Sequence, residues 1–155
     1  MTSDLERRLA EQGLQLPPAA APAANYQPYT ISGKLLLVSG QLPFRDGRIA
    51  ITGRLGDGVS LEQGQEAARL CALNLLAQAK AACDGDLGGL ARCLKLGAFV
   101  SCTPTFFDHP KVVNGASDLI AGVMGAAGHH ARFAVGCASL PLDAAVEVEA
   151  IFELV

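Results

Sequence analysis

The sequence predicts an α+β domain in which two helices pack on one face of a mixed β-sheet. Three observations lead to this prediction. Several short segments are apolar or alternate between apolar and polar residues, two longer segments repeat apolar residues at helical spacing, and the two kinds of segment are interspersed along the chain. A length of 155 residues suits one domain with a continuous core.

The chain begins with a segment that differs from the rest in composition. Ser3 and Glu6 have the spacing of a capping box and predict a short helix over residues 4–12 that stops at Gly13. Prolines and alanines follow, so residues 1–24 are expected to form an N-terminal helical and proline-rich extension, either packed on the main body or partly ordered. The domain itself is then expected over 25–155.

The body of the chain is expected to follow the order β-β-β-α-β-α-β-β. A second capping box, from Ser60 to Gln63, begins the longest helical pattern. The final segment is expected to be two strands joined by a turn at Pro141 to Asp143. The expected ranges are strands at 29–32, 35–40, 49–51 and 92–101, helices at 61–82 and 110–126, and the paired strands within 131–151.

Three charged residues lie within that final apolar pair of strands. Strand alternation places Glu147 and Glu149 on the face opposite the neighbouring valines, and Arg132 begins the first strand. All three are expected, in part, on the sheet face that has no helix to cover it. An arginine fork suits a carboxylate, and a nearby glutamate can accept protons, so the set suits a small carboxylate-bearing substrate. The alternative is an ordinary charged surface whose ion pairs contribute roughly 0 to 1 kcal/mol each.

Composition limits the possible partners and setting. The net charge of −3 and the absence of a basic run argue against nucleic acid as the main partner. Half of the residues are hydrophobic and 17% are charged, which suggests that other subunits cover some apolar surface. Five cysteines without a CxxC pair, and no secretion signal, favour free thiols in a reducing cytoplasm. No run reaches the roughly 20 apolar residues of a membrane helix, so a soluble protein is expected.

Five short motifs, in order and in register from about Tyr26 onward, resemble the YjgF/RidA family, also called endoribonuclease L-PSP. They are Val38–Pro43, Val113–Gly115, Ala131–Val135, Leu140–Pro141 and Val146–Ile151. The resemblance implies a chorismate-mutase-like domain and a homotrimer whose sheets form an inner barrel, with active sites in the clefts between subunits. It also implies an imine/enamine deaminase, a hydrolase that converts small 2-imino and enamino acids to 2-keto acids and ammonia without cofactor or metal.

The resemblance assigns site roles by position. Arg132 falls where the family's arginine grips the substrate carboxylate, and Glu147 where a glutamate orients the attacking water. The positions implied to line the site are Tyr26, which would close the cleft, Asn114, and Ser39 and Gly40 at a bordering strand end.

Two residues of the implied site depart from the family pattern. Ala134 replaces the usual cysteine, and the bulky Phe133 precedes it, so both are expected to shape the substrate pocket. Ala24-Asn25 replaces a glycine-proline, and an insertion is expected around 54–59. These departures indicate a divergent subgroup whose pocket holds a different molecule, and Arg132 implies that this molecule still carries an acid.

Other functions remain open at this point. The same cleft could serve a non-catalytic trimer that binds a metabolite carboxylate or a partner protein, and the family's older name suggests a ribonuclease, against which the negative charge counts. His129 and His130 are adjacent and point opposite ways on an extended chain, so no metal site is expected. Cys93 and Cys102 are interpreted as small core residues, because no base lies at a recognisable spacing. The glycine-rich run 53–58 lacks the GK[ST] ending of a phosphate loop.

Overall fold

A computed structural model describes residues 2–22 and 24–155 of the chain. Its α-helices are α1 (Asp4–Glu11), α2 (Leu61–Ala82) and α3 (His109–Met124). The main strands are β1 (Tyr29–Ser32), β2 (Leu35–Gln41), β7 (Leu90–Ser101), β8 (Ala131–Cys137) and β9 (Val146–Leu154). Between β2 and α2 lie two small pairs, β3 (Phe44–Arg45) with β4 (Arg48–Ile49), and β5 (Arg54–Leu55) with β6 (Gly58–Val59).

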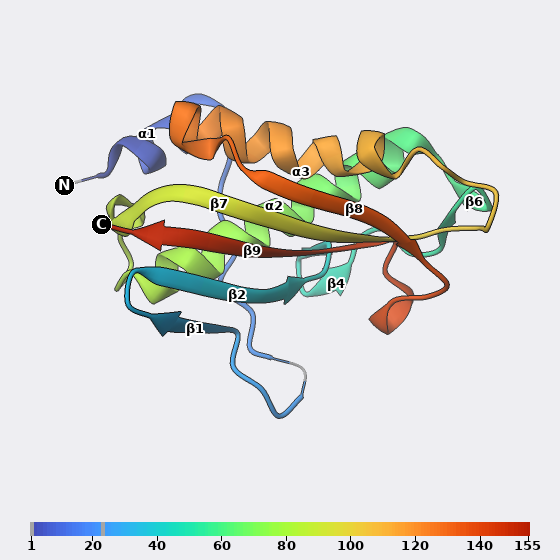
Figure 1. The fold of residues 1–155 in the computed structure, drawn as a ribbon, viewed down its shortest axis with the longest axis horizontal. Coiled ribbons are helices and arrows are strands. Elements are labelled where there is room, and N and C mark those ends of the chain that lie inside the picture. Colours follow the sequence, from blue (N-terminus) through green and yellow to red (C-terminus); the bar gives the residue numbers. More distant parts are fainter. Residues whose placement is uncertain (1, 23) are drawn as a thin grey trace.

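The five main strands form one mixed sheet in the order β1-β2-β9-β7-β8. All neighbours are antiparallel except β7 and β8, which run parallel. Figure 1 shows this sheet in front of α2, with α3 lying along the side of β8. The predicted α+β class, with a mixed sheet and two helices on one face, is therefore what the structure has.

The expected pairing of the last two strands is wrong. β8 and β9 do not pair with each other, because β7 lies between them. The chain reaches β8 through α3, and this crossover allows β8 to lie parallel to β7, with Arg132 opposite Leu96 and Val135 opposite Phe99. A turn signal such as Pro141–Asp143 shows only that the chain reverses direction, and here a third strand separates the two arms of the reversal.

The core fills the space between the helices and the sheet. Both helices carry the predicted apolar stripes. In β9 buried residues alternate with less buried ones, whereas β7 has a less regular pattern with three consecutive buried residues at 96–98. The opposite sheet face has no helix among the described residues. Four large apolar side chains lie on it with 40% to 43% of their surface exposed: Leu35, Leu37, Phe99 and Val135.

The N-terminal extension packs on the main body. Ser3 and Glu6 make the predicted capping box, and Glu6 forms an ion pair of 2.6 Å with Lys80 of α2. Gln12 donates a hydrogen bond to the carbonyl of Gly122 in α3. In Figure 1 the following segment, in blue, passes behind the sheet toward the loop before β1. The division at residue 24 stays a prediction, and Ala23 lies outside the described residues.

Membrane insertion by a helix finds no support in the described ranges 2–22 and 24–155. None of their helices combines the length and the apolar character needed to cross a bilayer.

Candidate functional site

Arg132 is held by neutral acceptors at the junction of β8 and α3. Its Nη1 donates hydrogen bonds to Asn114 Oδ1 at 2.9 Å and Ser117 Oγ at 3.1 Å, and its Nη2 donates to the Pro110 carbonyl at 3.3 Å. No carboxylate of the described residues forms an ion pair with it. The guanidinium is thus fixed in position while its charge is left uncompensated, which is the condition of an anion site.

A histidine, His130, is hydrogen-bonded to one of the side chains that hold Arg132. His130 Nδ1 lies 2.6 Å from the Gly128 carbonyl, which can only accept, so this nitrogen carries the proton. In the neutral imidazole, Nε2 then accepts the Ser117 hydroxyl proton at 2.9 Å, and the Ser117 oxygen is left to accept from Arg132. The chain His130–Ser117–Arg132 therefore orients the guanidinium through hydrogen bonds of defined direction.

Glu147 lies on the other face of the sheet, half-buried in β9. Its carboxylate occupies the space that a side chain at Gly40 would fill, so Gly40 is required for this placement. Burial, and secondarily the charge of Glu149, raise the pKa of Glu147 above its usual value. Within the described part of the chain it has no cation partner. The Glu147 carboxylate is therefore held where it loses part of its hydration, and carboxylates of this kind occur preferentially at functional sites.

Arg132 and Glu147 do not meet within one copy of the chain. Across β7, Arg132 is level with Leu96 and Glu147 with Phe99, three residues further along. Two strand spacings and three residue rises place their Cα atoms on the order of 14 Å apart. Their side chains also point to opposite faces, because Arg132 reaches α3. The expectation that Arg132 lies on the uncovered face is therefore wrong, whereas both glutamates do lie there.

The structure divides the other predicted site residues between these two places. Asn114 lies with Arg132. Gly40 and Tyr26 lie with Glu147 along the wall of one cavity, and Tyr26 is 48% exposed. Ser39 fixes the approach to β1, because its hydroxyl donates to the Gln27 carbonyl at 2.7 Å.

Phe133 and Ala134 line different faces of β8. Phe133 lies on the uncovered face, where it meets Phe99 edge-to-face at 5.5 Å and Lys95 Nζ at 5.4 Å from its ring centre. Ala134 packs at the edge of the core on the helix side. Only Ala134 thus shares a face with Arg132 within one copy.

The cysteines and histidines do not form a metal site among the residues described. Cys93 and Cys102 are buried, as expected of core residues. Cys102 Sγ also lies 3.4 Å from His109 Nε2, a contact between the residue after β7 and the start of α3 that sequence spacing alone did not indicate.

Ser117 and His130 are the site residues that the sequence analysis missed in this role. Ser117 follows Asn114 by three residues on the predicted helix, so the two share a face. That spacing was a usable signal. The place of His130 could not be inferred, because it depends on β8 lying against α3.

Comparison with known proteins identifies the family to which this chain belongs. The family model described as "YjgF/chorismate mutase-like, putative endoribonuclease" matches residues 6–154, and the chain belongs to this family. Protein TCP17 of Trypanosoma cruzi is 51% identical over 147 residues, which cover 94% of this chain and 91% of that protein.

Two solved structures are similar to this chain over nearly its whole length. A protein of unknown function from Agrobacterium tumefaciens is 53% identical, with a TM-score of 0.91 over 97% of this chain and 94% of its own. A "putative endoribonuclease" from Shewanella oneidensis MR-1 is 37% identical, with a TM-score of 0.93 over 97% of this chain and 99% of its own. The likeness extends over the N-terminal extension as well as the sheet, since 97% of this chain is covered in both.

Proposed function

We propose that this protein hydrolyses small 2-imino and enamino acids to 2-keto acids and ammonia. The observation that carries the proposal is Arg132, a guanidinium fixed by three neutral acceptors with no carboxylate of the described chain to neutralise it. A planar fork held in this way suits the two oxygens of a substrate carboxylate, and a charge-assisted hydrogen bond of this kind contributes roughly 1.5 to 3 kcal/mol.

Glu147 supplies the second group that the reaction needs. Hydrolysis begins when water adds to the carbon of the C=N bond, and a carboxylate that accepts one water proton makes this addition easier. The tetrahedral intermediate then expels ammonia, the C–N bond breaks, and the 2-keto acid remains. An enamine first takes a proton on carbon to become the imine. No redox step and no metal enters this balance.

The site is proposed to form between two copies of the chain. Arg132 and Glu147 lie on opposite faces of one sheet, so a substrate held by both requires Arg132 from one copy and Glu147 from another. The four exposed apolar side chains on the uncovered face, which include Leu37 and Phe99, give a second copy an apolar surface to cover. A homotrimer with a cleft between neighbouring subunits, the arrangement implied by the family resemblance, satisfies both conditions. A cytoplasmic setting stays a prediction.

The test is the rate at which 2-aminoacrylate or 2-iminobutanoate, generated in situ by a dehydratase, disappears with and without the protein. The wild-type protein is expected to accelerate the loss, and Arg132→Ala to abolish the acceleration while the melting temperature changes little. Size measurement by light scattering is run on both proteins, because a variant that fails to assemble would lose activity for another reason.

A non-catalytic carboxylate-binding trimer is the alternative that Arg132 also supports. It predicts that 2-oxobutanoate raises the melting temperature while imine loss is not accelerated. A ribonuclease is a weaker alternative, because the net charge is −3. RNA cleavage that persisted at the wild-type rate in Arg132→Ala would be attributed to contamination, whereas cleavage lost in this variant would contradict the deaminase proposal.

A further inference from the structure

A large cavity lies beside Glu147, and its size and lining point to the substrate's side chain. Its volume is about 1170 Å³, and its walls are mostly apolar. Most ligand pockets in proteins lie within roughly 300 to 1,000 Å³. A three- or four-carbon imino acid would leave nearly all of this volume to water.

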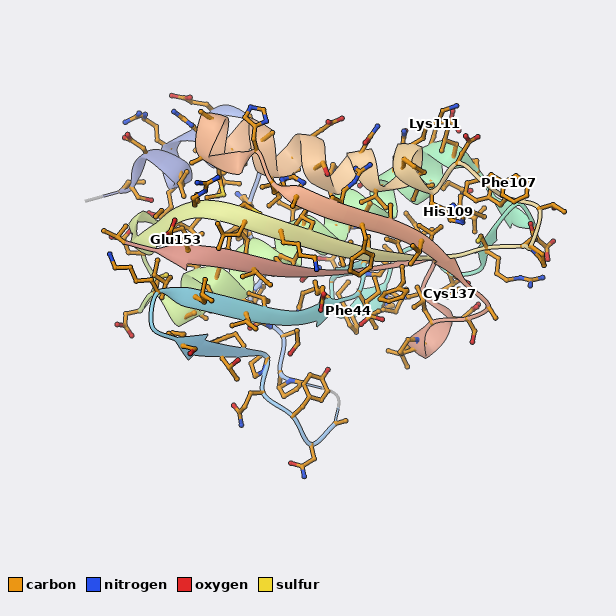
Figure 2. The ribbon with its side chains drawn as sticks, in the orientation of Figure 1. Phe44, Phe107, His109, Lys111, Cys137 and Glu153 are labelled. Carbon is orange, nitrogen blue, oxygen red and sulfur yellow. The ribbon has the colours of Figure 1, made fainter. Side chains whose placement is uncertain are left out.

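Three parts of the chain build most of the cavity, and residues 44–47 and 141–142 also line it. Glu147 and Gly40 line it from the sheet, Leu70 and Leu73 line it from α2, and residues 13–22 of the N-terminal arm close it. The end of β2 is open to the arm because β1 pairs with β2 only as far as Val38. Figure 2 labels Phe44, another lining residue, just beyond this end of β2.

The arm is attached to the body at the cavity wall. Gln78, which is 2% exposed, donates a hydrogen bond of 2.7 Å to the carbonyl of Ala20. A buried amide with a backbone partner fixes the arm more firmly than a surface contact, since breaking the bond would leave a buried polar group unsatisfied. The arm is therefore a wall of the cavity and not a loose cover.

Four charged residues line the cavity: Arg45, Asp46, Arg69 and Glu147. Both arginines pair with Glu66, whose carboxylate oxygens bind Arg69 at 2.7 and 2.8 Å, and one of which lies 3.8 Å from Arg45 Nη1. Glu147 has no cation partner among the described residues, so the end of the cavity at Glu147 is acidic. This end suits a C=N nitrogen that carries a proton, and the apolar remainder suits a hydrocarbon side chain.

We infer that the cavity receives the apolar side chain of the substrate, so that the preferred substrates are 2-imino acids with branched or extended hydrocarbon side chains of four or more carbons. The imine end lies at Glu147 and the side chain extends between α2 and the arm. This inference rests on the proposed hydrolysis, because the orientation of the imine depends on the role of Glu147.

The experiment compares imines generated by an L-amino acid oxidase from L-alanine, L-2-aminobutyrate and L-leucine. Burial of one methylene corresponds to roughly a four-fold change, so kcat/KM for the leucine imine should exceed that for the alanine imine by about ten-fold or more. In parallel, the shift in melting temperature is measured with 4-methyl-2-oxopentanoate and with pyruvate, which needs no turnover. The larger shift is expected with 4-methyl-2-oxopentanoate.

Two variants and one control connect the preference to the cavity. Ala20→Trp fills the cavity from the arm, where Ala20 is exposed, and Gln78→Leu removes the bond that holds the arm. Each should reduce the leucine-to-alanine ratio to about three-fold or less. Ala91→Trp adds the same bulk at an exposed position of β7 that does not line the cavity, and it should keep the wild-type ratio.

The outcomes separate this inference from the proposed function. Equal kcat/KM across the series in an active protein would overturn the inference and leave the hydrolysis intact. Without turnover of any imine the proposed function fails, and the inference about substrates fails with it; a larger shift with 4-methyl-2-oxopentanoate would then show only that the cavity binds a hydrocarbon side chain. In an active protein, equal melting shifts would overturn the inference. A loss of the ratio in Ala91→Trp equal to that in Ala20→Trp would also count against it.

Discussion

Asn114→Asp tests the role of Arg132 without removing the arginine. In the wild-type protein Asn114 Oδ1 accepts a hydrogen bond from Arg132 at 2.9 Å, and the aspartate can accept the same bond. The substitution therefore keeps the geometry and adds one negative charge beside the guanidinium. If Arg132 binds the substrate carboxylate, the new carboxylate competes for the same cation.

The expected magnitude follows from Coulomb's law. Two carboxylates about 5 Å apart repel each other by roughly 3 kcal/mol at an effective dielectric constant of 20, and by about half as much at 40. Because Asn114 is exposed to water, the effective dielectric constant can reach the higher value, and the lower repulsion energy applies there. The two figures correspond to a fall in kcat/KM of between about 15- and 200-fold. The exposed Asp–Arg pair adds only about 0 to 1 kcal/mol of stability, so the melting temperature should stay level or rise slightly.

The assay is kcat/KM for imine loss, with Lys111→Gln as the matched control. Lys111 lies on the same helix and pairs with Asp108 at 3.3 Å, and it takes no part in the hydrogen bonds that hold Arg132. Its replacement by glutamine lowers the net charge by one, as Asn114→Asp does. The control should retain activity within about three-fold. If Asn114→Asp also stayed within three-fold of wild type in a folded protein, Arg132 would not be the anion site.

Three further predictions concern titratable groups. Burial raises the pKa of Glu147, so its charge destabilises the fold above that pKa. Glu147→Gln should therefore melt higher than wild type at pH 7, lose this gain below pH 4.5, and abolish imine hydrolysis. An equal or lower melting temperature at pH 7 would contradict a desolvation cost at Glu147. Burial also raises the pKa of Cys93 to about 12. Iodoacetamide at pH 8 should therefore modify the partly exposed Cys137, and Cys93 should react only after unfolding, as detected by mass spectrometry. Early labelling of Cys93 would contradict its burial. The hydrogen bond from Lys80 lowers the pKa of Glu6. Lys80→Met should therefore reduce the free energy of unfolding by about 0.5 to 1 kcal/mol at pH 7 and by progressively less below pH 4.5, as measured by urea unfolding at several pH values. A difference that stayed constant with pH would exclude the ion pair as its cause.

Local patterns in the sequence predicted the helices well. The capping boxes at Ser3 and Ser60 are both present, and the helix predicted over 61–82 has those limits in the structure. The helix predicted over 110–126 lies at His109–Met124. Caps and apolar periodicity depend on neighbours within one or two turns, so a single sequence contains the information that fixes them.

Strand pairing depended on contacts that local patterns do not record. The separation of β8 from β9 by β7 is decided by segments distant in sequence, and the turn between them is compatible with either arrangement. The face of Arg132 was not readable either. Strand alternation places Arg132 and Ala134 opposite Phe133 and Val135, but no local pattern shows that these two apolar side chains occupy the uncovered face and turn Arg132 toward α3.

The two parts of the site differ in the same way. Asn114 and Ser117 could be grouped by helical spacing, and Glu147 and Glu149 by strand spacing. The cavity could not be predicted, because a stretch of prolines and alanines gives no sign of where it docks. Gln78 fixes the position of this stretch, but in the sequence Gln78 lies on the apolar side of a helix, like any core residue.

The central position of β9 has a consequence for how the chain folds as it is synthesised. β9 follows every other strand in the sequence, yet it lies between β2 and β7 in the sheet. Until Val146–Leu154 has left the ribosome, β1 and β2 cannot join β7 and β8, and each pair presents an unpaired edge to the solvent. The sheet therefore closes after translation of β9, and before that moment the nascent chain exposes two edges at which other chains can add.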